Sequence, residues 1–260
     1  MCKRTVFLMA AALAVALVAA PANAAVVTVD AVTGHNGGNW PSTLGHLSDM
    51  LNGNGSNDFG TGDHDPGMDT SADSNDPATW LNTSTSWPTE WLADGRLDAT
   101  TSANNKIGWV VMDFGSVVAN LENMYIWASQ HNTAGEDARD YNLYYSSGVG
   151  IDALPAMPNS RAWAGGSKAN ADYNFGNGDW TQIGSTETLS SPSGDGVTAI
   201  RSLGSISAQY IGIEILTAEN TDPNDRVGIA QIEFTQIPEP SGLILLATGL
   251  LALVGLRRRK

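Results

Sequence analysis

Cysteine and basic residues are scarce in this sequence of 260 residues. Its one cysteine, Cys2, cannot form an internal disulfide framework. Thirteen lysine and arginine residues stand against 27 aspartate and glutamate residues, which gives a formal net charge of −14. This balance argues against nucleic acid as a partner, because a nucleic-acid binder neutralises phosphates with a basic surface. Long amphipathic helical patterns are also missing, so the sequence does not predict a helical protein.

Turn-forming residues are abundant instead: 28 glycines and many Asn, Asp, Ser and Thr residues separate short runs of β-formers. The strongest strand candidates are Ile107–Phe114, Leu121–Ala128, Arg139–Ser146, Trp180–Ile183, Gln209–Leu216 and Arg226–Thr235, with an N-terminal strand within Val26–Val32. Alternation places Ile211, Ile213 and Ile215 on one face, as in a sheet with one side on a core. The pattern predicts an all-β fold, an antiparallel β-sandwich or jelly roll, over residues 25–236. Residues 52–77 are expected to form an acidic loop within it.

The first 24 residues are predicted to be a secretory signal peptide. Lys3 and Arg4 precede the apolar run Val6–Ala20, and Ala22-Asn23-Ala24 supplies a small-x-small cleavage pattern. The run is short for a bilayer span of about 20 residues, so a cleaved signal helix is favoured over a permanent anchor. We therefore expect export through the Sec machinery and removal of this segment by signal peptidase.

The last 24 residues, 237–260, have three parts in a fixed order. The rigid tripeptide Pro238-Glu239-Pro240 comes first, followed by the apolar stretch Gly242–Leu256. The basic stop consists of Arg257, Arg258, Arg259 and Lys260. A helix over the apolar stretch would be about 22 Å long, so we expect a short transmembrane helix that crosses with local thinning of the bilayer. The basic end should stay cytoplasmic, which leaves the body outside.

This end of the chain closely resembles the PEP-CTERM sorting signal of Gram-negative bacteria, and Pro238, Glu239 and Pro240 carry the resemblance. The resemblance implies recognition by an exosortase and cleavage near the Pro-Glu-Pro. It also implies transient anchoring in the inner membrane, then delivery to the cell surface or extracellular matrix. A plain C-terminal anchor is the alternative. Without the two ends, the body keeps 7 basic and 26 acidic residues, a net charge of −19, which favours solubility and makes a divalent cation a candidate partner.

A second set of motifs follows in order from Trp91 onward. They are Asp94-Gly95 with Thr100-Thr101, Trp109–Gly115, Asn123–Trp127, Arg139–Ser146, Trp180, Gln209–Ile213 and Val227–Phe234. Their order resembles a discoidin domain, the coagulation-factor type C module of the galactose-binding-like β-sandwiches, over about Trp91–Phe234. The resemblance implies binding without catalysis, usually of carbohydrate at loops on one end of the sandwich, often with a structural calcium nearby.

Calcium is coordinated by six to eight oxygen atoms, and two places offer them. In the discoidin-type loop the candidates are Asp94 and carbonyl groups near Arg96 and Thr100. The resemblance adds a ligand position in the last strand, where the family often has glutamate and this chain has Gln231. The second place is the acidic loop, where Asp63, Asp65 and Asp69 lack the glycine and the distant glutamate of an EF-hand. A solvated acidic loop is the alternative reading of this second place.

Tryptophans on loops are the candidate sugar platforms, because sugar sites need exposed aromatic side chains. Trp87, Trp91 and Trp163 are the candidates chosen, with Trp40 and Trp80 in similar loop-like surroundings. The alternative is that such tryptophans pin loops onto the sandwich. The strand tryptophans Trp109, Trp127 and Trp180 are predicted to be core residues.

The sequence therefore predicts a non-enzymatic, exported surface or matrix protein. Its β-sandwich would bind exopolysaccharide, another glycan or another matrix component, and an exosortase would process its tail. One alternative is a structural biofilm-matrix protein with no specific ligand. Another is a glycan hydrolase. The sequence positions of the 26 acidic residues in the body do not give the distance between any two carboxylates in the folded protein, so a catalytic pair is not identified. A serine triad would lack the supporting Gly-x-Ser-x-Gly elbow.

Overall fold

Two long antiparallel strands, β6 (Gly108–Trp127) and β9 (Ala199–Ile215), form the centre of the fold. The computed structural model describes residues 24–34, 68–69, 71–73, 75–82, 91–93, 107–128, 138–149, 151, 173–190, 195–218 and 227–237. Val26–Gln236 forms one compact unit. Around the central pair stand β1 (Ala25–Val27), β2 (Ala31–Gly34), β7 (Asp140–Ser146), β8 (Thr181–Thr188) and β11 (Gln231–Gln236). Short elements complete the described part: β3 (Met68–Asp69), the 3-10 turn η2 (Pro77–Thr79), β4 (Leu81–Asn82), β5 (Trp91–Ala93) and β10 (Val227–Ile229).

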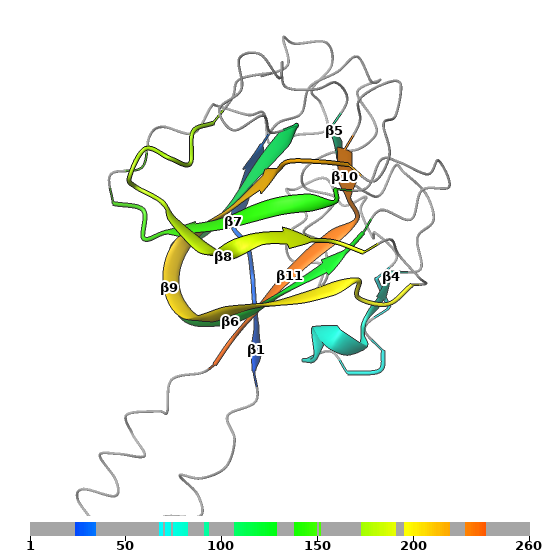
Figure 1. The fold of residues 1–260 in the computed structure, drawn as a ribbon. Coiled ribbons are helices and arrows are strands. Elements are labelled where there is room, and N and C mark those ends of the chain that lie inside the picture. The colour runs from blue at the N-terminus through cyan, green and yellow to red at the C-terminus, as the bar shows by residue number, and fades with distance from the viewer. Residues whose placement is uncertain are drawn as a thin grey trace, which may run out of the picture. The chain divides into compact units, whose positions relative to one another are not determined.

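The central strands bend, and the bend divides one hydrogen-bonded sheet into two layers. The register of β6 against β9 shifts between Asp113 and Val118 and twice more before Asn123. Positive φ angles occur at Gly115 and Asn120 in β6 and at Gly204 and Ser205 in β9. Such bulges bend both strands at the same place, and Figure 1 shows the resulting sharp curve of β9.

Each half of the central pair recruits different neighbours. The first half of β6 pairs with β2, with Val32 opposite Met112, and the second half of β9 pairs with β7, to which β8 adds the edge. The second half of β6 pairs with β11, with Ile232 opposite Ile126, and β1 lies beyond β11. The sheet order is β1-β11-β6-β9-β7-β8, with β2 on β6. Separate two-stranded sheets pair β10 with β5 and β3 with β4.

The main core lies between the two layers. Val110, Met112 and Phe114 from the first half of β6 share one buried cluster with Ile126 from its second half. Phe114 meets Phe234 of β11 edge-on, with ring centroids 5.2 Å apart, so the layers touch directly. Such edge-to-face pairs add to the gain from burying both rings. The protein is therefore an all-β, antiparallel β-sandwich, as the sequence predicted.

Several predicted strands are confirmed with different limits. One strand, β6, contains both of the separate candidates Ile107–Phe114 and Leu121–Ala128. The segment between them continues the strand through bulges. The last candidate divides into β10 and β11 at Ala230. The predicted isoleucine face of β9 is confirmed, since Ile211, Ile213 and Ile215 all lie in the main core.

The predicted terminal helices fall outside the described residues, as does most of the acidic loop 52–77. Among the residues described, none belongs to a helix long and apolar enough to cross a membrane.

Candidate functional site

Most of the predicted site residues lie outside the described part of the chain. These are Trp87, Trp163, Asp63, Asp65, Asp94, Thr100, Pro238, Glu239, Pro240, Arg257, Arg258, Arg259 and Lys260. Trp91 lies in β5, opposite Ile229, and Asp69 lies in β3, opposite Leu81; the side chains of both are outside the described part. Gln231 is the candidate whose surroundings can be examined.

Gln231 belongs to a row of buried polar side chains on the outer face of β11. Because side chains alternate along a strand, Ile232 and Phe234 enter the main core while Gln231, Glu233 and Thr235 face the other way. These three are between 0% and 5% exposed, so the outer face here is also covered. We call Gln231, Glu233 and Thr235 the β11 polar row.

The β11 polar row is incompletely hydrogen-bonded among the described residues. Gln231 donates from Nε2 to Glu233 Oε1 at 3.0 Å. Gln231 Oε1 and Thr235 Oγ1 are buried without a partner, and so is the indole Nε1 of Trp127, which stands opposite Gln231 in β6. A buried polar atom without a partner costs about 1–3 kcal/mol. The row is therefore a place where water or a ligand would gain hydrogen bonds or coordination.

The row also bears on the implied calcium ion. Calcium takes amide carbonyl oxygens as well as carboxylates, and Gln231 offers one buried oxygen without a partner. In the described part of the chain no group of three or more His, Cys, Asp or Glu side chains is arranged to hold a metal ion. The donor chemistry of Gln231 thus fits calcium, while the other proposed ligands, Asp94 and Thr100, lie outside the described residues.

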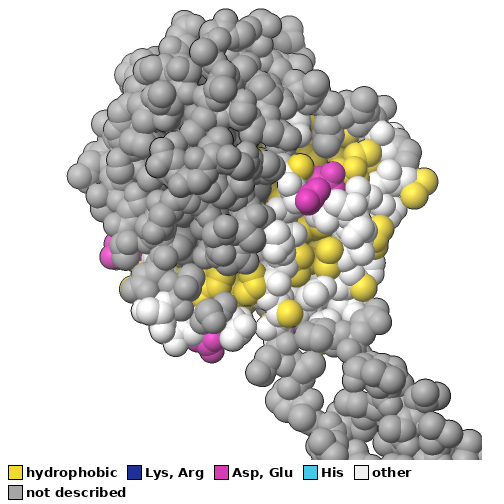
Figure 2. Space-filling view, turned by 180° about the vertical axis from the view of Figure 1, so that it is seen from behind, with side chains coloured by type: hydrophobic (Ala, Val, Ile, Leu, Met, Phe, Trp, Pro, Cys, Tyr) yellow, Lys and Arg dark blue, Asp and Glu magenta, His cyan; other side chains and the backbone are white. Residues whose placement is uncertain are grey.

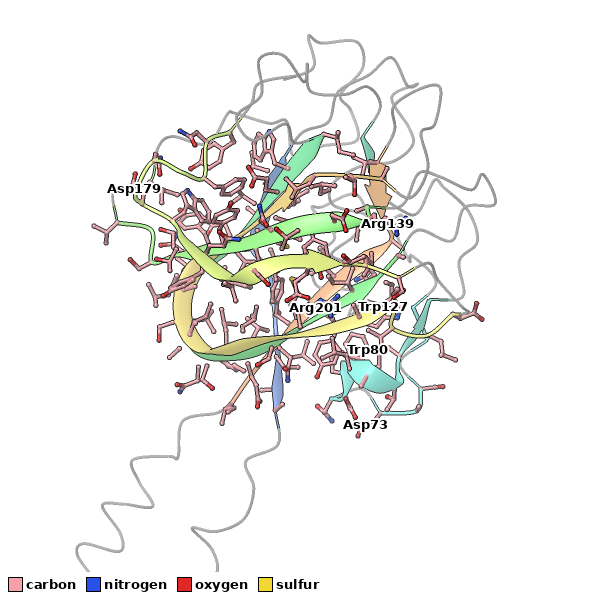
Figure 3. All side chains as sticks on the ribbon, in the orientation of Figure 1. Asp73, Trp80, Trp127, Arg139, Asp179 and Arg201 are labelled. Atoms are coloured by element: carbon pink, nitrogen blue, oxygen red, sulfur yellow. The ribbon has the colours of Figure 1, made fainter. Side chains whose placement is uncertain are left out.

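A tryptophan from a loop covers the neighbouring part of this face. Trp80 packs against Tyr125, Trp127 and Ala230 and is 1% exposed. Its Nε1 donates to the carbonyl oxygen of Asp73 at 2.7 Å. Asp76 caps the preceding turn η2 by accepting from the N–H of Ala78. Figure 3 shows Trp80 beside Trp127, with Asp73 below them. Trp80 therefore pins its loop onto the sandwich instead of forming an exposed sugar platform.

A second aromatic cluster covers the outer face of the other layer. Trp109, Val111, Tyr144, Tyr173, Phe175 and Trp180 form this cluster. Phe175 stacks on Tyr144 with ring centroids 4.8 Å apart, and Trp180 donates from Nε1 to the hydroxyl of Tyr173 at 3.1 Å. We call the segment 173–180, which supplies three of these rings, the aromatic cap. All three strand tryptophans are at most 7% exposed, which confirms that they are core residues.

Glu214 is buried in β9 beside Tyr144, and no motif in the sequence indicates its role. It accepts from Tyr144 Oη at 2.9 Å and from Asn142 Nδ2 at 3.0 Å. Burial, together with the hydrogen bond to Glu214, raises the pKa of Tyr144 to about 12. Asn142 Oδ1 in turn accepts from Thr186 Oγ1 at 2.8 Å, so the polar contacts continue to the edge strand β8. The position of Glu214 between Ile213 and Ile215 was the only indication in the sequence that this carboxylate lies in a core strand.

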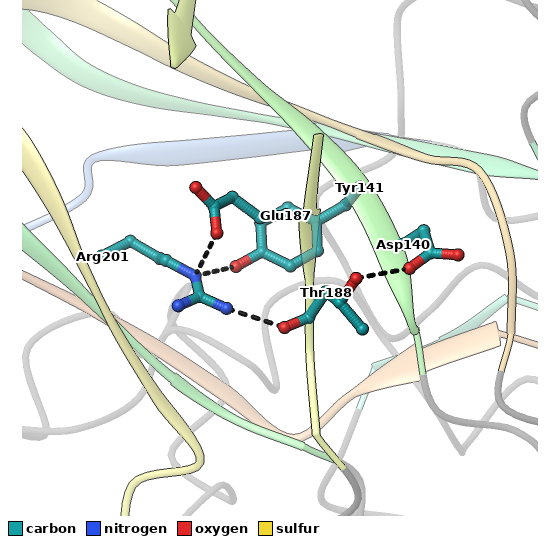
Figure 4. Close-up of polar contacts among 5 residues, drawn as sticks. All are labelled: Asp140, Tyr141, Glu187, Thr188 and Arg201. Atoms are coloured by element: carbon teal, nitrogen blue, oxygen red, sulfur yellow. Dashed lines mark hydrogen bonds and ion pairs between the residues drawn. The ribbon is translucent and has the colours of Figure 1, made fainter. Parts of the chain in front are cut away.

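Arg201 in the first half of β9 contacts residues of β7 and β8 (Figure 4). Its Nε donates to Tyr141 Oη at 2.7 Å and lies 3.5 Å from Glu187 Oε2, and its Nη2 donates to the carbonyl oxygen of Thr188 at 2.8 Å. Burial raises the pKa of Tyr141, against the opposing effect of the guanidinium.

Asp140, at the start of β7, accepts hydrogen bonds from the hydroxyls of Thr188 and Thr217. These two bonds lower the pKa of Asp140, and the bond from Thr188 has the larger effect.

One face of the described part carries acidic side chains among apolar ones. In Figure 2, which views the molecule from behind Figure 1, yellow hydrophobic side chains and white uncharged side chains or backbone cover most of the described area, and the charged groups visible there are carboxylates. The larger exposed apolar side chains in the described residues are Leu81, Val117, Val149 and Ile200. They stand on separate elements, so they do not by themselves define a binding surface.

The tail matches a known family. Residues 236–260 match the PEP-CTERM protein-sorting motif, which confirms the resemblance carried by Pro238, Glu239 and Pro240. No curated protein matches the chain.

Solved structures similar to the chain include the following three. An F5/8 type C domain from Bacteroides fragilis is 12% identical, with a TM-score of 0.36, and covers 60% of this chain and 78% of its own. A fucose binding module from Streptococcus pneumoniae is 9% identical, with a TM-score of 0.39, and covers 81% and 93%. A family 32 carbohydrate-binding module of a glycoside hydrolase from Clostridium perfringens is 14% identical, with a TM-score of 0.36, and covers 56% and 74%. The fold itself is established by the strand pairing described above.

Proposed function

We propose that the protein is exported and then sorted by an exosortase, which cleaves near Pro238-Glu239-Pro240 and delivers the body to the cell surface or extracellular matrix. The match of residues 236–260 to the PEP-CTERM motif carries this proposal. The apolar stretch Gly242–Leu256 would hold the precursor in the inner membrane until cleavage. The motif follows directly on β11, which ends at Gln236, so cleavage there would leave the sandwich whole.

The sorting proposal is tested by following the tail in a Gram-negative host with and without its exosortase. With the enzyme present, mass spectrometry should find the body without residues 242–260, outside the inner membrane. Replacing Pro238, Glu239 and Pro240 with alanine should leave the full tail attached and the protein in the membrane fraction. Ser241→Ala is the matched control and should be processed normally. Equal processing in the host without exosortase would contradict the proposal.

We further propose that the sandwich binds a carbohydrate or another matrix component without cleaving it. The support is the order of discoidin-like motifs, together with their positions on β6, β7, β9 and β11 of an antiparallel sandwich. Trp87, Trp91 and Trp163 are the proposed contacts, since exposed aromatic rings stack on sugar faces. The competing proposal is a structural matrix protein without a specific ligand.

Glycan arrays followed by calorimetry on the processed protein separate these proposals. Saturable binding that is lost in Trp87→Ala, Trp91→Ala or Trp163→Ala, and kept in Thr89→Ala, supports a glycan-binding protein. No binding to any matrix polysaccharide favours the structural role. New reducing ends after incubation with such a polysaccharide would instead show hydrolysis.

We also propose weak calcium binding, in which Gln231 would contribute its side-chain oxygen and Asp94 a carboxylate. The buried, unpartnered Oε1 of Gln231 supports this role. Calorimetry and thermal unfolding with calcium chloride should show heat and a raised midpoint that Gln231→Leu removes and EDTA reverses. The same midpoint with calcium and with EDTA would contradict it.

A further inference from the structure

The first and last strands of the body are neighbours at one edge of the sheet. β1 and β11 are hydrogen-bonded to each other at the end of the strand order. Figure 1 shows the start of β1 and the end of β11 on the same side of the body. β1 begins at Ala25, directly after the predicted cleavage pattern Ala22-Asn23-Ala24, and β11 ends two residues before Pro238. The two positions predicted for proteolytic processing are therefore attached to adjacent strands.

β1 is short but it is held on both of its faces. Val27 is 7% exposed and belongs to the main core between the layers. Val26 points to the opposite face and packs against the cluster of Trp80, Tyr125 and Trp127. The backbone of β1 is hydrogen-bonded to that of β11. Opening the whole of β1 thus requires that Val26, Val27 and the backbone of the strand leave their sites.

This arrangement has a consequence for proteolysis of the bond between Ala24 and Ala25. Proteolytic cleavage favours exposed, mobile segments of a folded chain, and a bound peptide uses the same backbone groups as a paired strand. A peptide bond at the first residue of a docked strand cannot fill a protease cleft while that strand stays in the sheet.

We propose that signal peptide removal must precede the docking of β1 on β11, so that a body which closes this edge first becomes resistant to signal peptidase. This inference rests on the proposed export of the protein. The order of synthesis provides the required delay, because β11 follows β1 by about 200 residues, or roughly 10 to 40 s at about 5–20 residues per second. The tail follows β11 directly, so leader removal comes before the edge closes and before the tail is processed.

The test uses the full chain with its leader, synthesised without membranes, folded in detergent and then treated with purified signal peptidase. The native precursor should be cleaved after Ala24 about tenfold or more slowly than precursor freshly diluted from urea, since β1 must open before cleavage. A five-residue Gly-Ser insertion between Ala24 and Ala25 moves the cleavage site away from the sheet. It should restore cleavage of the native precursor to near the rate of the unfolded one.

The matched control is the same insertion after Val149, which is 83% exposed and far from β1 in the sequence. That variant should stay as resistant as the native precursor. Equal cleavage of native and unfolded wild-type precursor would overturn the inference while leaving the export proposal intact. Failure of every precursor, including the unfolded one and the Gly-Ser variant, to be cleaved after Ala24 would instead contradict the predicted signal peptide itself.

Discussion

Phe175 of the aromatic cap lies directly against the backbone of Gly212 in β9, at a place where any β-carbon would overlap the phenylalanine ring. The same ring stacks on Tyr144 of β7 and meets Trp180 edge-on, with ring centroids 5.0 Å apart. The cap can therefore sit flat on the sheet only because residue 212 has no side chain. The glycine in the pattern Tyr210–Leu216 is a packing requirement of the aromatic cap, and its backbone conformation is ordinary for a strand.

Gly212→Ala is expected to lower the free energy of unfolding by about 1–3 kcal/mol, because an added methyl group in a packed region forces its neighbours to move. Gly196→Ala is the matched control, since a β-carbon there meets nothing within 4 Å. Chemical denaturation of the processed protein measures both. Combining Gly212→Ala with Phe175→Ala should cost less than the sum of the two single changes, and strict additivity would show that the ring does not cause the effect.

Arg201 is expected to stabilise the sandwich through its hydrogen bonds more than through its ion pair. Arg201→Met leaves the buried hydroxyl of Tyr141 without its donor and should cost about 1–3 kcal/mol. Glu187→Gln removes only a partly exposed contact and should cost less than about 1 kcal/mol. A double-mutant cycle with Tyr141→Phe gives the coupling energy, and a value near zero would contradict this assignment.

Alkaline pH is expected to destabilise the body through Tyr144. Its pKa is raised to about 12, so the neutral phenol is favoured in the folded protein over the unfolded one. Its contribution to stability is complete below the ordinary pKa of about 10 and is lost as the pH rises toward about 12. Tyr144→Phe should therefore show a shallower fall of unfolding free energy above pH 10. Equal slopes for the two proteins would contradict the raised pKa.

The buried side chains could be predicted from the sequence in strands that have one apolar and one polar face. They could not be predicted where both faces of a strand are covered. Ile211, Ile213 and Ile215 were placed correctly because apolar residues alternate with others along β9. Glu214, in the same strand, is 0% exposed because the outer face is also covered, which no local pattern reveals.

The bend and the buried polar face depend on contacts distant in sequence. Ile107–Phe114 and Leu121–Ala128 were predicted as two strands, whereas they belong to one strand, β6, in which Gly115 and Asn120 have positive φ angles where its register against β9 shifts. Gln231 was singled out by the motif order, but its hydrogen bond to Glu233 follows from the burial of the whole β11 polar row. The tail could be assigned from sequence because a linear motif, unlike a site, needs no folding to be recognised.

The buried hydroxyl of Thr235 has no hydrogen-bond partner among the described residues. Valine has nearly the same shape, so Thr235→Val removes the cost of an unpaired polar group and leaves the packing intact. The free energy of unfolding should stay equal or rise by about 1 kcal/mol. Thr198→Val is the matched control: Thr198 Oγ1 accepts from the N–H of the buried Ala128 at 3.0 Å. Losing that acceptor should cost about 1–2 kcal/mol. If Thr235→Val destabilises the protein as much as Thr198→Val, then the Thr235 hydroxyl binds a water molecule or a ligand that the valine displaces. Unfolding of the two variants with and without calcium would show whether that ligand is calcium.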